Sequence, residues 1–159
     1  MVIKEASKAD ISILLDILRK SFNGVAKKFN LTVENCPKNL AFCTAQRIED
    51  DFARGLQYYM LEDDGQMCGC VALEKASDDI FYLERLAVLP EHRRKGFGAA
   101  LVNHVFDQVK ETGAIRVEIG IISKDMELKS WYKRFGFIPK GTRKYHHLPF
   151  VVEFMYKEL

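Results

Sequence analysis

The sequence lacks any long hydrophobic run. Although 48% of its 159 residues are hydrophobic, no stretch approaches the roughly 18 apolar residues that a membrane-spanning helix needs. The first residues, Met1 to Glu5, include charged side chains and no apolar segment of the kind found in signal peptides. We therefore expect a soluble, cytoplasmic protein with no membrane partner.

A large excess of charge of either sign is also missing. The net charge is +2, which gives no bulk electrostatic attraction to nucleic acid, so we expect no nucleic-acid partner. The four cysteines lack the Cys-x-x-Cys pairs that are typical of zinc sites. Cys68 and Cys70 flank one glycine in a predicted strand and are expected on the same face. We expect reduced thiols and no metal.

No repeat, low-complexity tract or linker divides the chain, so we expect a single domain over residues 1–159. Hydrophobic periodicity predicts both helices and strands along the chain. The expected elements, in chain order, are a strand over 2–6, a helix from about 11 to 22, a mostly irregular stretch over 23–43, a helix over 44–54, strands over 56–62, 66–75 and 80–88, a helix over 98–112, a strand over 115–121, a helix over about 128–135, and strands over 138–146 and 150–157. This order predicts an α/β (α+β) fold. Its mixed, mostly antiparallel sheet has about seven strands, flanked by about four helices.

A basic turn with two glycines connects the strand that ends at Val88 to the helix that begins near Gly98. Such a turn leaves backbone N–H groups without partners at the positive end of a helix dipole, which favours a bound anion. Glycine lets phosphate oxygens approach the backbone, so we expect a pyrophosphate ligand. The alternative is a solvated basic turn at a helix start. The residues assigned to the anion site are Arg93, Arg94, Lys95, Gly96, Phe97, Gly98 and Ala99.

Two other phosphate-binding loops do not fit this turn. A P-loop has a Gly-Lys-Ser/Thr stretch with another glycine several residues before it, and this turn has neither. A dinucleotide fingerprint needs a further glycine where Leu101 stands.

The stretch Val88-Leu89-Pro90 followed by Arg93-Arg94-Lys95-Gly96-Phe97-Gly98 resembles the pyrophosphate loop of the GNAT superfamily of N-acetyltransferases. The later stretch Tyr132-Lys133-Arg134-Phe135-Gly136-Phe137 is similar to that family's Tyr-x-x-x-Gly-Phe signature. The two motifs lie about 35 residues apart in the expected order, and the resemblance covers nearly the whole chain. It implies a GNAT-like fold and acetyl coenzyme A (acetyl-CoA) as co-substrate. It also implies a possible homodimer.

The resemblance implies a role for several individual residues. Tyr132 stands where the family commonly has the acid that protonates the leaving thiolate; the alternative is a core aromatic residue. Backbone groups around Leu86 and Val88 would hold the acetyl and pantetheine portion. Asp125 stands where many members have asparagine. It is able to cap a helix, but as a carboxylate it donates no hydrogen bond, so a family contact to coenzyme A that uses the amide is in doubt.

Glu84 is the candidate base that accepts the proton of the amine, directly or through water. A carboxylate is uncommon in the middle of a strand unless that face opens on a cleft, and some polyamine-type family members have a glutamate there. A salt bridge on the strand face is the alternative, and Glu118 is a second candidate base. With the acidic run Glu49-Asp50-Asp51, Glu84 favours a small cationic amine as acceptor. That run is also compatible with a solvated helix face.

The predicted function is therefore an acetyl-CoA-dependent N-acetyltransferase, in which a primary amine attacks the thioester directly. Two alternatives remain. One is a non-catalytic acyl-CoA-binding sensor or scaffold module. The other is an acetyltransferase that acts on protein N-termini or lysines.

Overall fold

The predicted order of elements is confirmed in the computed structural model, which describes residues 1–159. The strands are β1 (Val2–Glu5), β2 (Gln57–Asp63), β3 (Gln66–Lys75), β4 (Ile80–Val88), β5 (Arg116–Ile122), β6 (Ile138–Lys144) and β7 (Val151–Glu158). The helices are α1 (Ile11–Lys28), α2 (Ala45–Ala53), α3 (Phe97–Thr112) and α4 (Met126–Lys133), with short 3-10 turns at Lys8–Asp10, Leu40–Phe42 and Pro90–His92.

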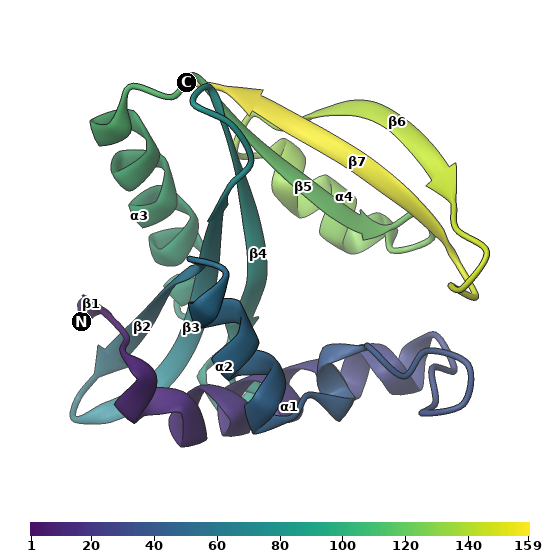
Figure 1. Cartoon of the computed structure of the whole chain (residues 1–159), viewed down its shortest axis with the longest axis horizontal. Coiled ribbons are helices and arrows are strands. Elements are labelled where there is room, and N and C mark those ends of the chain that lie inside the picture. Colours follow the sequence, from purple (N-terminus) through teal and green to yellow (C-terminus); the bar gives the residue numbers. More distant parts are fainter.

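The strands form one sheet in the order β1-β2-β3-β4-β5-β7-β6. Every neighbouring pair is antiparallel except β4 and β5, as expected for a mixed, mostly antiparallel sheet. The parallel pair is short, because only Ile80–Tyr82 pairs with Arg116–Glu118. Beyond these residues β4 and β5 diverge, and Figure 1 shows β5, β7 and β6 leaving the direction of β2–β4 like the second arm of a V.

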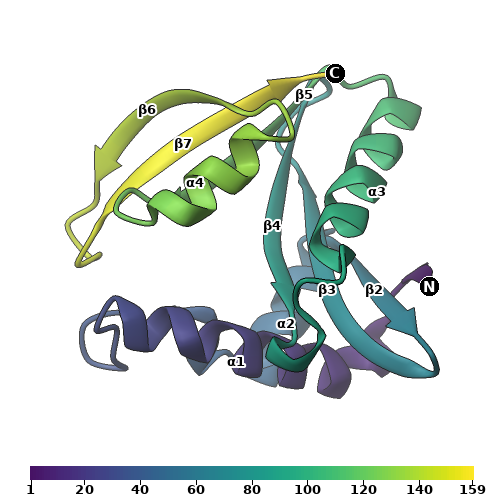
Figure 2. The same cartoon turned by 180° about the vertical axis from the view of Figure 1, so that it is seen from behind.

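The helices cover opposite faces of this sheet. Leu101, Val105 and Val109 of α3 and Tyr132 of α4 belong to the larger hydrophobic core on one face. A second core on the other face contains Leu14, Ile17 and Leu18 of α1 together with Ile48 of α2. Figures 1 and 2 show the same division, with α2 in front of the sheet in the first view and α4 in front in the second. The point at which β4 and β5 diverge thus lies between helices that cover opposite faces.

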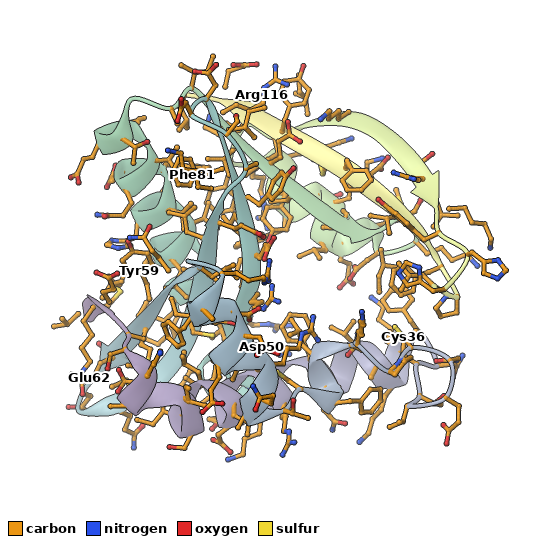
Figure 3. All side chains as sticks on the ribbon, in the orientation of Figure 1. Cys36, Asp50, Tyr59, Glu62, Phe81 and Arg116 are labelled. Atoms are coloured by element: carbon orange, nitrogen blue, oxygen red, sulfur yellow. The ribbon has the colours of Figure 1, made fainter.

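A third, small hydrophobic cluster joins the end of α1 to the C-terminal strands. Ala26, Leu31 and Cys36 are buried there against side chains that include Leu148 and Phe150. Figure 3 shows Cys36 on the loop after α1, opposite the turn between β6 and β7. This contact links the two arms of the V at their open end.

The first helix is longer than the sequence predicts. Residues 23–28 were expected to be irregular because of Asn23-Gly24, but α1 continues through them to Lys28. A glycine inside a helix costs about 1 kcal/mol relative to alanine, and burial of Ala26 in the third cluster offsets that cost. None of the helices is long and apolar enough to cross a membrane.

Two local features of β2 and β3 determine where their side chains point. Asp64 and Gly65 both have positive φ, 50° and 74°, so they form the two-residue hairpin turn expected from the Asp-Gly pair. The pairing then shifts by one residue, so that Cys68 is an extra residue in β3.

The expectation that Cys68 and Cys70 share a face is therefore wrong. Because a bulge reverses the alternation of side chains, Cys68 lies in the core beneath α3, whereas Cys70 lies in the core beneath α1 and α2. All four cysteines are buried free thiols.

Candidate active site

A cleft of about 1400 Å³ occupies the opening between β4 and β5. Its walls come from α1, the two diverging strands, the start of α3, α4 and the β6–β7 hairpin. Every residue assigned to the site from the sequence lines this cleft except Lys95; those that do are Glu84, Leu86, Val88, Arg93, Arg94, Gly96, Phe97, Gly98, Ala99, Asp125 and Tyr132. Residues from four separate sequence segments thus meet in one space.

The turn before α3 presents a row of free backbone donors. Arg94 and Gly96 have left-handed φ angles of 64° and 82°, which bend the chain around the end of β4. None of the six N–H groups from Arg94 to Ala99 donates a hydrogen bond within the chain, and Gly96 supplies no side-chain cap. Because the positive end of the helix dipole lies in the same place, the loop has the properties of an anion site.

Arg93 holds this loop in place. Its Nε donates to the carbonyl oxygen of Val88 at 3.0 Å, and one Nη donates to the carbonyl oxygen of Ser21 in α1 at 3.0 Å. These two bonds fasten the loop to the end of β4 and to the opposite helix. Arg94, by contrast, makes no salt bridge or side-chain hydrogen bond within the chain and lies on the cleft wall, where its charge is available to an anion.

Gly98 and Phe97 also take part in the packing of the helices next to the loop. A side-chain carbon at Gly98 would lie 3.2 Å from Cζ2 of Trp131, a tight contact, so glycine favours the close approach of α3 and α4 here. The Phe97 ring is buried in the core beneath α3. The contribution of these two residues to the anion site therefore comes from their backbone N–H groups.

A bulge in β4 controls the other side of the cleft. Cys70 pairs with Ala87 but Ala72 pairs with Glu84, so Arg85 and Leu86 both stand opposite one residue of β3. Arg85 occupies the left-handed conformation found in one type of bulge, with φ 53°. As a result Leu86 and Val88 pack against the core beneath α3 and α4, while Glu84 faces the side of α1 and α2.

Glu84 is a partly buried carboxyl group on the cleft wall. Burial raises the pKa of Glu84 to about 7; a hydrogen bond with Glu74 and the negative charge of Glu74 add to the shift, whereas the charges of Arg85 and Arg54 oppose it. Nη1 of Arg85 lies 2.7 Å from Oε2 of Glu84. A carboxyl group with this pKa is able to take up and release a proton near neutral pH.

Tyr132 lies on α4 at the opposite wall. Its ring packs edge-on against Trp131 at 5.0 Å and against Phe137 at 5.4 Å between ring centres. The hydroxyl has no hydrogen-bond partner within the chain, and burial raises the pKa of Tyr132 above its usual value. The phenol therefore stays protonated in the cleft, and it is both a core aromatic residue and an available donor.

Asp125 caps α4, because its Oδ1 accepts a hydrogen bond from the Leu128 N–H at 3.2 Å. The Lys28 Nζ of α1 lies 3.8 Å from the same oxygen. The carboxylate is thus engaged with a helix end and a lysine. The capping expected of this residue is present, and any contact of Asp125 with a ligand has to use an acceptor oxygen.

Glu118, the second candidate base, is buried in an ion pair. Lys140 of β6 places its Nζ 2.9 and 3.1 Å from the two carboxylate oxygens, and Arg116 lies 3.7 Å away. Two cations thus hold the Glu118 carboxylate, whereas Glu84 has one short arginine contact. The geometry favours Glu84 over Glu118 as the group that exchanges a proton.

Sequence reasoning does not identify the ion pairs of Asp51. The run Glu49-Asp50-Asp51 is expected to favour a cationic acceptor or to form a solvated helix face, but Asp51 is only 2% exposed and pairs with Arg85 and Arg54. The hydrophobic residues of α2 carried a signal for this. Ile48 and Phe52 mark the inward face of the helix, and Asp51 lies between them at helical spacing.

Comparison with known proteins agrees with this geometry. The chain matches the profile of the Acetyltransferase (GNAT) family over residues 17–137. An uncharacterized N-acetyltransferase of Mycobacterium tuberculosis is 32% identical over 88 residues, which are 53% of this chain and 56% of that protein; the chain thus spans about half the length of the curated relatives it matches.

Two solved structures extend the likeness to the complete fold. The PaiA N-acetyltransferase of Thermoplasma acidophilum, crystallised with coenzyme A, superposes with a TM-score of 0.81 at 17% identity, covering 100% of both chains. A ribosomal-protein-alanine N-acetyltransferase of Brucella melitensis gives 0.73 at 19% identity, again over 100% of both chains. The family match spans more than half of the sequence and includes both motifs found in it. The chain therefore belongs to the GNAT family of acetyltransferases.

Proposed function

We propose that the protein is an N-acetyltransferase that moves an acetyl group from acetyl-CoA to a small cationic amine. One observation carries the proposal. The N–H groups of residues 94–99 are free, and all of these residues except Lys95 line the same cleft as Glu84 and Tyr132. An anion site, a proton acceptor and a proton donor thus share one space, which is what acyl transfer from a pyrophosphate-bearing thioester to an amine requires.

The residues of the cleft fit acetyl-CoA in three places. The donors of residues 94–99, with Arg94 and the α3 dipole, suit the pyrophosphate. Beyond Tyr82 the edge of β4 that faces β5 has no strand partner, and around Leu86 and Val88 it offers backbone groups to the pantetheine arm and the acetyl carbonyl. Tyr132 stands across the opening from this strand, where its hydroxyl would meet the sulfur.

Proton movement follows from the two titratable groups. An alkylammonium has a pKa near ~10.4, so an amine reaching the site carries a proton that it must lose before it attacks the thioester carbon. Glu84, with a pKa of about 7, accepts that proton directly or through water. As the carbon–sulfur bond breaks, the Tyr132 hydroxyl donates a hydrogen bond to the departing sulfur and stabilises its negative charge.

The part of the cleft around Glu84 and Glu118 is suited to a small, positively charged substrate. Aromatic rings line it beside the Glu84 and Glu118 carboxylates, and such rings attract cations as carboxylates do; the rings are those of Phe22, Tyr82, Tyr145, Phe150 and Phe154. The contact between Cys36 and the β6–β7 hairpin bridges the open end of the V. This bridge leaves a flexible amine easier access than a folded protein surface.

An acceptor screen tests the function. Acetyl-CoA is mixed with polyamines, amino acids, aminoglycosides and peptide N-termini, and release of free thiol is followed for each. We expect the highest kcat/KM with a small cationic amine. Faster reaction of peptides than of every small amine would indicate instead an acetyltransferase that acts on protein N-termini. Tight binding of acetyl-CoA without thiol release for any amine would make the protein a non-catalytic acyl-CoA-binding module.

A further inference from the structure

A buried network of charges lies directly behind Glu84. Asp51 of α2 faces Arg85 of β4 with two contacts, Oδ2 to Nε at 3.0 Å and Oδ1 to Nη2 at 3.2 Å. The Tyr58 hydroxyl donates to Asp51 Oδ2 at 2.5 Å, and Arg54 Nη2 donates to Oδ1 at 2.9 Å. The side chains of Asp51 and Arg85 are only 3% and 10% exposed. Tyr58 is a buried partner of the Asp51 carboxylate and Arg85 a mostly buried one, whereas the Arg54 side chain is 52% exposed and contacts it from the protein surface.

The β4 bulge connects this network to the cleft. Successive residues of a regular strand point to opposite faces, but the bulge directs both Glu84 and Arg85 toward α2. Arg85 therefore donates a hydrogen bond from Nη2 to Asp51 and keeps Nε in ionic contact with the same carboxylate, while its Nη1 donates to Glu84 at 2.7 Å. One guanidinium thus joins a buried aspartate to the carboxylate in the cleft, using the planar geometry that distinguishes arginine from lysine.

Stability alone does not account for this arrangement. A left-handed backbone is unfavourable for arginine, and a buried ion pair is often no more stable than apolar residues of similar size. Such a strained, desolvated pair beside a cleft persists where it performs a task there. The geometrical result is that Glu84 has a fixed orientation, because its partner Arg85 is itself held at two other atoms.

We propose that Asp51 is a positioning residue, which acts through Arg85 to hold the Glu84 carboxylate at the amine-binding wall and to set its proton affinity. The inference rests on the proposed function, in which Glu84 accepts the proton of the amine. The other charged groups near Glu84 are Glu74 of β3 and Arg54 of α2, which pair with each other at 2.9 Å. Asp51→Asn weakens one of the two carboxylate contacts of Arg54, whereas the pair between Arg54 and Glu74 does not involve Asp51.

The substitution Asp51→Asn tests this role, because it keeps the size of the side chain and removes its charge. Loss of a nearby negative charge, and of the competitor for Arg85, both lower the pKa of Glu84. We expect the acid limb of the kcat/KM profile for a small amine to move down by about one pH unit. We also expect kcat/KM at neutral pH to fall roughly tenfold, with the affinity for acetyl-CoA unchanged by calorimetry.

Two further variants separate positioning from folding. Asp51→Glu keeps the charge but displaces the carboxylate, so kcat should fall while the acid limb stays in place. Glu49→Gln is the matched control, since it removes an exposed carboxylate two residues away that makes no ion pair, and it should behave as the parent. Parent-like kcat/KM and pH profile in both Asp51 variants would overturn the inference. A parent-like Glu84→Gln enzyme would overturn the proposed base instead.

Discussion

Replacing Glu84 with glutamine changes how the stability of the protein depends on pH, independently of any reaction. Glutamine keeps the size of the side chain but does not titrate. Glu84 titrates in the folded protein with a pKa of about 7, against 4.5 for the unperturbed group, chiefly because it is buried. The carboxyl group is thus favoured in its protonated form by folding, and its ionisation is unfavourable.

The sign and size of the effect follow from this shift. A pKa that is raised on folding contributes stability that is fully present below pH 4.5 and is lost as pH rises through 7. A glutamine at this position does not titrate, so the variant loses no stability from residue 84 over this pH range. Because one unit of pKa difference corresponds to about 1.4 kcal/mol, the free energy of unfolding of Glu84→Gln should gain about 2 kcal/mol on that of the parent between pH 5 and pH 8.

Urea denaturation of both proteins at pH 5 and pH 8 measures this double difference. The glutamine amide oxygen is able to accept the hydrogen bond from Arg85, and any change in its strength is present in the variant at both pH values and so largely cancels. Glu49→Gln, which removes an exposed carboxylate, serves as the control for the loss of one charge. A difference between Glu84→Gln and the parent that stayed constant from pH 5 to pH 8 would refute the argument that burial governs the titration of Glu84.

Substitutions at four other positions test separate parts of the structure. Tyr132→Phe removes the donor but keeps the ring packing, so kcat should fall roughly 10²-fold with acetyl-CoA affinity little changed; a fall below about threefold, with chemistry rate-limiting, would leave Tyr132 a packing residue. Ala99→Glu places a negative charge in the anion site and should abolish acetyl-CoA binding in calorimetry, whereas Ala99→Gln should weaken it less; equal affinities would remove the loop assignment. Gly69→Ala would set a methyl group 2.5 Å from the carbonyl oxygen of Ala87 and should destabilise the fold by ~1–3 kcal/mol in urea denaturation. Gly24→Ala, at a helical position with open space around it, should stabilise by ~0.5–1 kcal/mol, and the same sign for both glycines would contradict the packing described.

Much of the fold could be predicted because local signals and tertiary packing agree. Alternation along β5 and the stripe of α3 each identify a face that is buried in the structure. The Asp64-Gly65 turn has the backbone that its residues favour. The GNAT resemblance, drawn from the loop before α3 and the end of α4, is confirmed by the family match over residues 17–137.

The parts that escaped prediction depend on contacts between distant segments. The two bulges, at Cys68 and at Arg85, arise from strand pairing, and they reverse which side chains share a face. The burial of Asp51 likewise depends on Arg85, 34 residues later in the chain. The roles of Tyr132 and Glu84 stay predictions, although the structure brings both to one cleft.

In the proposed function, the loop before α3 and the opening between β4 and β5 serve acetyl transfer to an amine. Its most direct test is to incubate the protein with acetyl-CoA and a small cationic amine, then to identify the amine product by mass while free thiol is measured. We expect one acetylated amine for each thiol released, with a rate that falls in Glu84→Gln. Thiol release without an acetylated amine, or no release at saturating acetyl-CoA with every amine, would contradict the claim.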